Sequence, residues 1–248
     1  MKDEQDATLF GERVAARYDE TSAEMFAPEV LDPTVALLAE LTGEGRALEF
    51  AIGTGRVAIP LAERGVEVHG IERSEAMAER LRAKPGGERI PVTIGDMTTT
   101  RVEGGFSLVY LVYNTIQNPG TQDAQVACFR NAARHLEPGG CFVIEVGVPD
   151  LQRLPPGERF VVFDAGDTHW GIDEYDVATQ SLTSHHFEVV DDRIERSTFP
   201  FRYVWPAELD LMAQLAGMGL RERWAGWTRE PFTSDSRSHV SVWEKPAS

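Results

Sequence analysis

The chain alternates short apolar runs with helix-patterned segments between residues 32 and 146. This alternation is typical of a parallel sheet covered by helices on both faces. The runs that we expect to form strands are residues 46–51, 66–71, 90–94, 106–113 and 141–146. The run 106–113 is almost continuously apolar, as expected of a central strand buried on both faces. The hydrophobic pattern therefore predicts an α/β fold with a doubly wound sheet.

Helices are indicated by capping residues and by apolar spacing. Asp32 and Pro33 are typical of an N-cap and a first helical position, which predicts a helix that runs to Gly43. Ser74 is the predicted N-cap of a later helix. Apolar residues recur at helical spacing in a further helix, at Val126, Phe129, Ala133 and Leu136. The helix that begins after Ser74 and the helix that contains Val126 would each supply a crossover of the kind that parallel strands require.

The pattern changes after Pro149, where strand-favouring residues replace the alternation. Residues 183–189 alternate with a period of two, residues 191–192 are two aspartates suited to a turn, and residues 194–203 have the pattern of a return strand. We therefore expect a small antiparallel sheet inserted after the fifth parallel strand. A helix at 206–218 and a last strand at 239–243 would complete the chain.

This pattern predicts two structural units. Residues 1–148 and 205–248 are expected to form the core, and residues 149–204 an inserted antiparallel lid that serves as a substrate subdomain. The length of 248 residues suits one α/β domain with such an insertion.

The composition restricts the partners of the chain. A formal net charge of −16 at pH 7 opposes binding to a phosphate backbone, which favours a small-molecule partner over nucleic acid. Residues 1–10 lack the layout of a signal peptide and no apolar run could span a bilayer, so we expect a cytoplasmic protein without membrane contact. Cys128 and Cys141 are expected to be free thiols, and no residues show metal-ligand spacing.

A glycine-rich turn follows the first predicted strand, in the segment LEFAIGTGR at residues 48–56. Gly53 and Gly55 let a ligand approach the backbone, and the helix that follows offers free N–H groups. Glu72, at the end of the second strand, can accept hydrogen bonds from both hydroxyls of a ribose. These features suit NAD and S-adenosylmethionine (SAM) alike, so an NAD(P)-dependent oxidoreductase stays open beside a SAM-binding protein.

Two further features favour SAM. Glu49 lies in an otherwise apolar strand, where a carboxylate is costly without a partner, and the ammonium of an amino-acid ligand would be such a partner. Gly95, Asp96 and Met97 follow the third strand. There the Asp96 side chain can accept from the adenine amine while the Met97 N–H donates to the adjoining ring nitrogen. A plain Asx turn is the alternative for this segment.

The motifs Glu49-x-Ala51-x-Gly53-x-Gly55, Glu72, Gly95-Asp96-Met97 and residues 136–145 resemble, in this order, those of class I SAM-dependent methyltransferases. The similarity covers residues 8–146 well. Within that superfamily the chain is similar to small-molecule methyltransferases of antibiotic tailoring, including amino-sugar N-methyltransferases. Those enzymes carry an N-terminal helix that ends in Tyr-Asp, here Tyr18-Asp19. Ala51 departs from the glycine that is frequent in the family, and we expect the loop to keep its path.

The resemblance implies a Rossmann-like, seven-stranded sheet whose last strand is antiparallel. It also implies methyl transfer from SAM, with S-adenosylhomocysteine (SAH) as product, to an amine or hydroxyl of a secondary metabolite. The residues expected to contact the cofactor are Tyr18, Glu49, Ala51, Gly53, Gly55, Arg56, Glu72, Arg73, Met77, Gly95, Asp96, Met97, Tyr113 and Asn114. Tyr18 is the first candidate to stabilise the sulfonium through a cation–π contact. Gln117, Glu145 and Tyr203 are candidates for the acceptor side.

His186, His185 and Tyr18 are the candidate catalytic residues. The two histidines are neighbours on a predicted strand, so their side chains point to opposite faces and only one can readily face the substrate as a base. A SAM-binding module without catalysis is the third function that stays open. A homo-oligomer formed through the inserted sheet stays open too.

Overall fold

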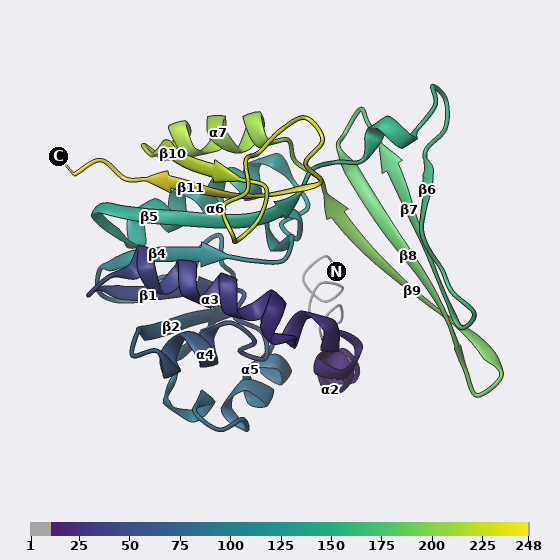
Figure 1. Ribbon diagram of the computed structural model, residues 1–248. Coiled ribbons are helices and arrows are strands. Elements are labelled where there is room, and N and C mark those ends of the chain that lie inside the picture. Colours follow the sequence, from purple (N-terminus) through teal and green to yellow (C-terminus); the bar gives the residue numbers. More distant parts are fainter. Residues whose placement is uncertain (1–10, 248) are drawn as a thin grey trace.

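The computed structural model describes residues 11–247, which form two sheets (Figure 1). The larger sheet has seven strands in the order β10-β11-β5-β4-β1-β2-β3. Their bounds are Arg46–Phe50 (β1), Glu67–Glu72 (β2), Val92–Ile94 (β3), Phe106–Leu111 (β4), Leu136–Gly147 (β5), Gly219–Trp224 (β10) and Ser238–Glu244 (β11). Strands β1 to β5 pair in parallel, and β11 runs antiparallel to both of its neighbours. The predicted doubly wound fold with an antiparallel last strand is confirmed.

Helices cover both faces of this sheet (Figure 1). The α-helices are Glu12–Thr21 (α2), Pro28–Thr42 (α3), Ala58–Glu63 (α4), Glu75–Arg82 (α5), Gln122–His135 (α6) and Pro206–Leu215 (α7). Short 3-10 helices are Ala23–Phe26 (η1), Gly87–Arg89 (η2), Thr115–Gln117 (η3) and Leu151–Arg153 (η4). No helix within residues 11–247 combines the length and the apolar character that a membrane crossing needs. The segment tested for a signal peptide, residues 1–10, lies outside the described residues.

The central strands alternate between two apolar layers. Val109 and Leu111 of β4 belong to the layer under α6 and α7, whereas Leu108 and Tyr110 belong to the layer under α3, α4 and α5. All four side chains are fully buried. β4 is therefore buried on both faces, as its continuous apolar run predicts.

Some predicted boundaries are wrong, and one strand was missed. α3 begins at Pro28, which occupies the first helical position after an extended Ala27, so Pro33 lies inside the helix and costs it one backbone hydrogen bond. α6 ends at His135, and Leu136 instead pairs with Phe106 in the sheet. β10 was not predicted, because this edge strand is half polar and presents mostly exposed or half-buried side chains.

The second sheet is an antiparallel meander in the order β6-β7-β8-β9. Its strands are Phe160–Ala165 (β6), His169–Asp176 (β7), Ser181–Val190 (β8) and Arg193–Arg202 (β9). Asp191 and Asp192 both have positive φ, 50° and 57°, as a tight hairpin turn requires. Figure 1 shows this sheet standing beside the carboxyl ends of the parallel strands. The inserted antiparallel sheet predicted from the sequence is present.

A buried hydrogen-bonded ion pair joins the second sheet to the core. Arg202, at the end of β9, donates to Glu208 of α7 at 2.8 Å and to the amide oxygen of Gln125 of α6 at 2.5 Å. The Gln125 amide nitrogen donates back to the Arg202 carbonyl at 3.0 Å. Burial raises the pKa of Glu208, but hydrogen bonds from Arg202, Gln180 and Gln122 outweigh this and hold it below its ordinary value. The carboxylate stays ionised and keeps the junction paired.

Non-glycine residues adopt the left-handed conformation where β1 and β4 end. Ala51 follows β1 with φ 53°, and Tyr113 and Asn114 follow β4 with φ 55° and 61°. Such residues cost of the order of 1–2 kcal/mol each and concentrate at functional sites. Because β1 and β4 are neighbours, this strain falls at a single edge of the sheet.

Replacing Ala51 by glycine should therefore stabilise the protein by about 0.5–1 kcal/mol, because glycine adopts a positive φ without steric cost. Urea unfolding measures the change in the free energy of unfolding. Ala47→Gly in the buried, extended part of β1 is the matched control and should destabilise the protein by about 1 kcal/mol. If Ala51→Gly destabilises as much as Ala47→Gly, the left-handed conformation at residue 51 is not strained.

Candidate functional site

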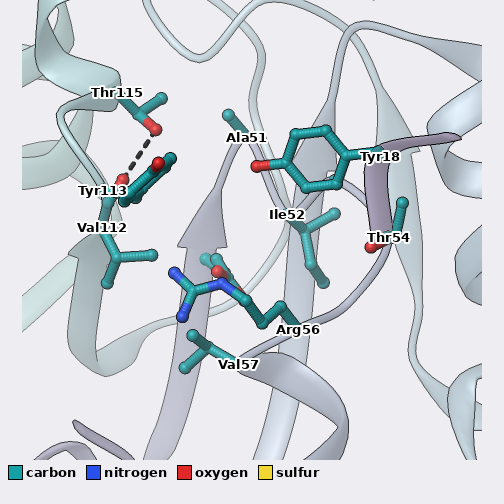
Figure 2. A pocket seen from close by; sticks show the side chains of 11 residues that line it. Tyr18, Ala51, Ile52, Thr54, Arg56, Val57, Val112, Tyr113 and Thr115 are labelled. Atoms are coloured by element: carbon teal, nitrogen blue, oxygen red, sulfur yellow. Dashed lines mark hydrogen bonds between the residues drawn. The ribbon is translucent and has the colours of Figure 1, made fainter. Parts of the chain in front are cut away.

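A pocket lies where β1 and β4 end, and Figure 2 shows side chains entering it from both strands and from α2. Its lining residues are Tyr18, Glu49, Ala51, Ile52, Gly53, Thr54, Arg56, Val57, Val112, Tyr113 and Thr115. The sheet order reverses between β1 and β4, and ligands of open α/β sheets bind at this kind of switch point. Six predicted residues meet here: Tyr18, Glu49, Ala51, Gly53, Arg56 and Tyr113. The sequence did not single out the other five, although two of them, Ile52 and Thr54, belong to the glycine-rich segment 48–56.

Glu49 places a buried carboxyl group at the floor of this pocket. The side chain is 3% exposed and accepts a hydrogen bond from the Tyr110 hydroxyl at 2.8 Å. Burial raises the pKa of Glu49 to about 8, despite that hydrogen bond and the nearby positive charge of Arg56. The carboxyl is therefore largely protonated at pH 7, and a bound cation would favour its ionised form.

Two tyrosines and one arginine surround the pocket mouth. Figure 2 shows Tyr18 and Tyr113 entering from opposite sides, with the Arg56 side chain between them and below. The Arg56 guanidinium lies 5.8 Å from the centre of the Tyr113 ring and donates to the Met25 carbonyl at 3.2 Å. Burial raises the pKa of Tyr18, although Arg56 opposes the shift. The pocket therefore offers aromatic surface and a positive charge close to the Glu49 carboxyl.

Glu72 fixes the glycine turn rather than lining the pocket. One carboxylate oxygen accepts from the Gly53 N–H and the other from the Ser74 N–H, both at 2.8 Å. Burial raises the pKa of Glu72, and these backbone hydrogen bonds oppose the shift. The Glu72 carbonyl also accepts from the Gly95 N–H at 2.8 Å, which ties the end of β2 to the loop after β3. The Arg73 N–H is a third backbone donor to this carboxylate, which leaves one of its roughly four lone-pair sites for a further donor.

Asp96 forms the Asx turn that was the plain alternative for its segment. Its Oδ1 accepts from the Thr98 N–H at 2.7 Å and from the Thr98 hydroxyl at 2.6 Å. Within residues 11–247, Oδ2 has no hydrogen-bond partner, so the half-buried carboxylate can still accept from a ligand. The Met97 carbonyl accepts from buried Asn131 at 2.9 Å, which holds the loop on α6.

The remaining cofactor candidates lie around the glycine turn or the next loop. Gly55 has φ +80°, and a Cβ there would come within 3.0 Å of Leu81. Met77 is buried in the first turn of α5, whose predicted cap is confirmed by the 3.2 Å bond from the Met77 N–H to the Ser74 hydroxyl. Arg73 is exposed beside Glu72.

Contacts among Asp19, Thr54 and Lys84, which were not predicted and which we call the latch, join α2 to the glycine turn. Asp19 accepts from the Thr54 hydroxyl at 2.6 Å and pairs with the Lys84 ammonium at 2.5 Å. The same ammonium donates to the Thr54 carbonyl at 2.9 Å and lies 5.3 Å from the centre of the Phe26 ring. The Tyr18-Asp19 motif could have indicated Asp19, but nothing local in the sequence points to Lys84. The latch holds Tyr18 at the pocket.

The loop after β4 is held by Glu145, predicted for the acceptor side, and by Asn114, predicted to contact the cofactor. The Glu145 carboxylate accepts from the Tyr113 N–H at 3.0 Å, and the Asn114 side-chain oxygen accepts from the Gly147 N–H at 2.6 Å. Gln117 lies half-buried in η3 of the same loop. Glu145 and Asn114 thus position Tyr113 by fixing its backbone.

The other acceptor and base candidates belong to the second sheet. His185 and His186 lie on opposite faces of β8: His185 contacts Glu174 at 3.3 Å, and His186 contacts His169 at 3.1 Å. Tyr203 is buried and packs on the ring of Tyr175, 5.6 Å between centroids. None of the three lines the pocket formed by residues 18–115.

These groups fit a ligand that combines an amino acid with a nucleoside. The buried Glu49 carboxyl suits an ammonium, the remaining acceptor site of Glu72 suits a ribose hydroxyl, and the unpartnered Asp96 oxygen suits an amine on a base. Tyr18 and Tyr113 offer ring faces to a sulfonium. Residues 11–247 hold no group of three His, Cys, Asp or Glu side chains arranged to bind a metal ion.

Known proteins similar to this chain indicate which class of ligand the pocket binds. The family described as "Methyltransferase domain" matches residues 47–140. The chain is similar to the solved structure of the CcbJ methyltransferase from Streptomyces caelestis, with 37% identity, a TM-score of 0.85, and coverage of 96% of this chain and 98% of that one.

Two curated relatives carry more specific names. The cypemycin N-terminal methyltransferase of a Streptomyces species is 28% identical over 240 residues, which span 92% of this chain and 97% of the relative. A dTDP-4-amino-2,3,4,6-tetradeoxy-D-glucose N,N-dimethyltransferase of Saccharopolyspora spinosa is 34% identical over 99 residues, 40% of this chain and 39% of that protein. The near-complete match to CcbJ, together with the strand-end pocket, shows that this chain belongs to the SAM-dependent methyltransferases and that its cofactor is SAM.

Proposed function

We propose that this methyltransferase transfers the methyl group of SAM to the nitrogen of a small-molecule amine. The observation that carries this proposal is the similarity to two N-methyltransferases, one of which matches over 92% of the chain. The net charge of −16 supports a small-molecule acceptor over nucleic acid. Hydroxyl acceptors are the second candidate, because neither the pocket nor the charge distinguishes them from amines.

In this proposal each strand end holds one part of SAM. Glu49 pairs with the ammonium, Glu72 accepts from the ribose hydroxyls, and Asp96 with the Met97 N–H binds the adenine edge. The ring faces of Tyr18 and Tyr113 flank the sulfonium, which supplies the methyl group. Their positions support this arrangement, because both tyrosines enter the same pocket as Glu49 (Figure 2). Alignment of acceptor and methyl group then provides most of the rate acceleration.

We also propose that residues 149–204 form the substrate subdomain. The second sheet stands at the carboxyl edge of the core sheet, where the pocket lies, and this arrangement supports the proposal (Figure 1). Gln117 and the Tyr113 loop, which Glu145 holds, would form the core side of the acceptor site.

Matched acceptor pairs test the choice between nitrogen and oxygen. The probes are a dTDP-4-amino sugar with its 4-hydroxyl analogue, and a short peptide with a free N-terminal amine with its N-acetylated form. Transfer of labelled methyl from SAM is expected to at least one amine and at least about tenfold more slowly to its blocked or hydroxyl partner. Transfer to the hydroxyl analogue alone, or to no amine, would contradict N-methylation.

Asp96→Ala should weaken SAM binding by more than about tenfold, because the adenine amine loses its acceptor; this equals about 1.4 kcal/mol. Titration calorimetry with SAM measures the affinity. Thr98→Ala is the matched control, since it removes the hydroxyl donor to Asp96 but keeps the carboxylate, and it should change the affinity less than about threefold. Equal losses in both variants would mean that Asp96 acts only through its turn.

SAM binding should release close to one proton at pH 7, because Glu49 with a pKa of about 8 is protonated in the free protein and its ionised form pairs with the ammonium. Affinity should accordingly rise as the pH increases toward the pKa of free Glu49. Calorimetry in phosphate and in Tris, whose ionisation enthalpies differ, measures the released proton. Glu49→Gln should abolish the release. Equal heats in both buffers for the wild type would refute the pairing.

A further inference from the structure

One face of the second sheet is turned toward the cofactor side of the molecule. Ser184, His186 and Glu188 alternate along β8 and therefore share this face, which we call the inner face. Glu188 accepts a hydrogen bond from Arg17 of α2 at 3.1 Å. Arg17 precedes Tyr18 in the sequence, so the Glu188 end of the inner face lies against the helix that carries Tyr18 to the pocket.

Five side chains on the inner face form a continuous hydrogen-bonded chain. Asp164 of β6 bonds to Nδ1 of His169, and Nε2 of His169 lies 3.1 Å from Nδ1 of His186. Nε2 of His186 lies 3.3 Å from the Ser184 hydroxyl, which bonds in turn to Asp173 directly across on β7. All five groups can exchange protons or relay them, so an unbroken path runs along the sheet.

Asp173 and Asp164, the two ends of this hydrogen-bonded series of side chains, differ in their access to water. Asp173 has one carboxylate oxygen, Oδ1, that is buried and has no hydrogen-bond partner among the described residues. Asp164 at the other end is 45% exposed. Burial raises the pKa of Asp173, whereas the hydrogen bond from His169 lowers the pKa of Asp164. A proton taken up at the buried end can thus leave at the exposed end.

His186, the central group of this hydrogen-bonded series, is half-buried between two aromatic rings and lies among several titratable groups. The rings of Phe163 and Phe199 lie 5.3 and 5.4 Å from that of His186. Burial lowers the pKa of His186, His169 lowers it further, and Asp164 opposes the shift. The titratable or charged groups around it are Asp164 from β6, His169 and Asp173 from β7, His185 and Glu188 from β8, and Arg17 from α2. A neutral His186 can accept a proton from one neighbour and pass it to the other.

We propose that this chain, Asp173–Ser184–His186–His169–Asp164, is a proton relay that deprotonates the acceptor amine. The inference rests on the proposed N-methylation, because an amine that is an ammonium in water must lose a proton before its lone pair can attack. An N–H bond breaks, its electron pair stays on nitrogen, and the proton passes to Asp173. A proton then moves through Ser184, His186 and His169 to Asp164, which releases it to water. One proton leaves for each methyl group transferred.

His186→Gln breaks the relay while keeping a side chain of similar length. His185→Gln is the matched control, since it changes the adjacent residue on the opposite face, where the ring contacts Glu174 and Thr198. Both variants are assayed with SAM and with the amine acceptor that the wild type methylates. The assays run between about pH 6.5 and about pH 9.5. SAM affinity by calorimetry should equal that of the wild type in both.

His186→Gln is expected to lower kcat at least about tenfold near pH 7, and the loss should shrink at high pH because the amine then reaches the site without its extra proton. His185→Gln should stay within about twofold of the wild type. If His186→Gln does not fold, His169→Gln, at a 35% exposed side chain, interrupts the same path.

A loss in His186→Gln that is equal at every pH, or equal to that of His185→Gln, would overturn the relay and leave N-methylation standing. A wild type that methylates no amine would overturn the proposed function, and the relay with it. The two failures are therefore distinguishable.

Discussion

The bond between the Glu72 carboxylate and the Gly53 N–H is the constraint on which the rest of the site depends. It joins the turn after β1 to the end of β2, and the second oxygen of the same carboxylate holds the start of α5 through the Ser74 N–H. Because the Glu72 carbonyl also holds Gly95, three loops at one edge of the sheet are fixed relative to each other. A buried carboxylate with several backbone donors is stable only when all of them are in place, which makes this arrangement specific.

The residues with left-handed backbone lie at the same edge of the sheet as these fixed loops. Ala51, Tyr113 and Asn114 are left-handed where the adjacent strands β1 and β4 end. Ala51 precedes the glycine turn that Glu72 holds, and Glu145 accepts from the Tyr113 N–H. The Asp19 latch and the Glu145 carboxylate bring Tyr18 and Tyr113 to the same pocket from opposite sides (Figure 2). Conformational cost is thus concentrated where the two rings enter the pocket.

Much of the fold could be predicted because the central strands are buried on both faces, and such strands have continuous apolar runs in the sequence. β10 could not be predicted, since an edge strand keeps polar residues such as Arg221 and Arg223 that pair across the sheet. The six pocket residues found in advance lie at strand ends or on the helix with the Tyr-Asp motif. Lys84 lies far in the sequence from Asp19, and His169 lies on another strand than His186, so only tertiary folding brings each pair together.

The second sheet adds a row of titratable groups, and the Glu188 end of their face lies against the helix that carries Tyr18. The proposed SAM site depends on three strand ends that meet at one adenosyl amino acid, and a crystal structure with SAH tests this most directly. It should place the adenine amine within about 3 Å of Asp96, the ribose hydroxyls at Glu72, and the sulfur between Tyr18 and Tyr113. An adenosyl group bound away from these side chains would contradict it.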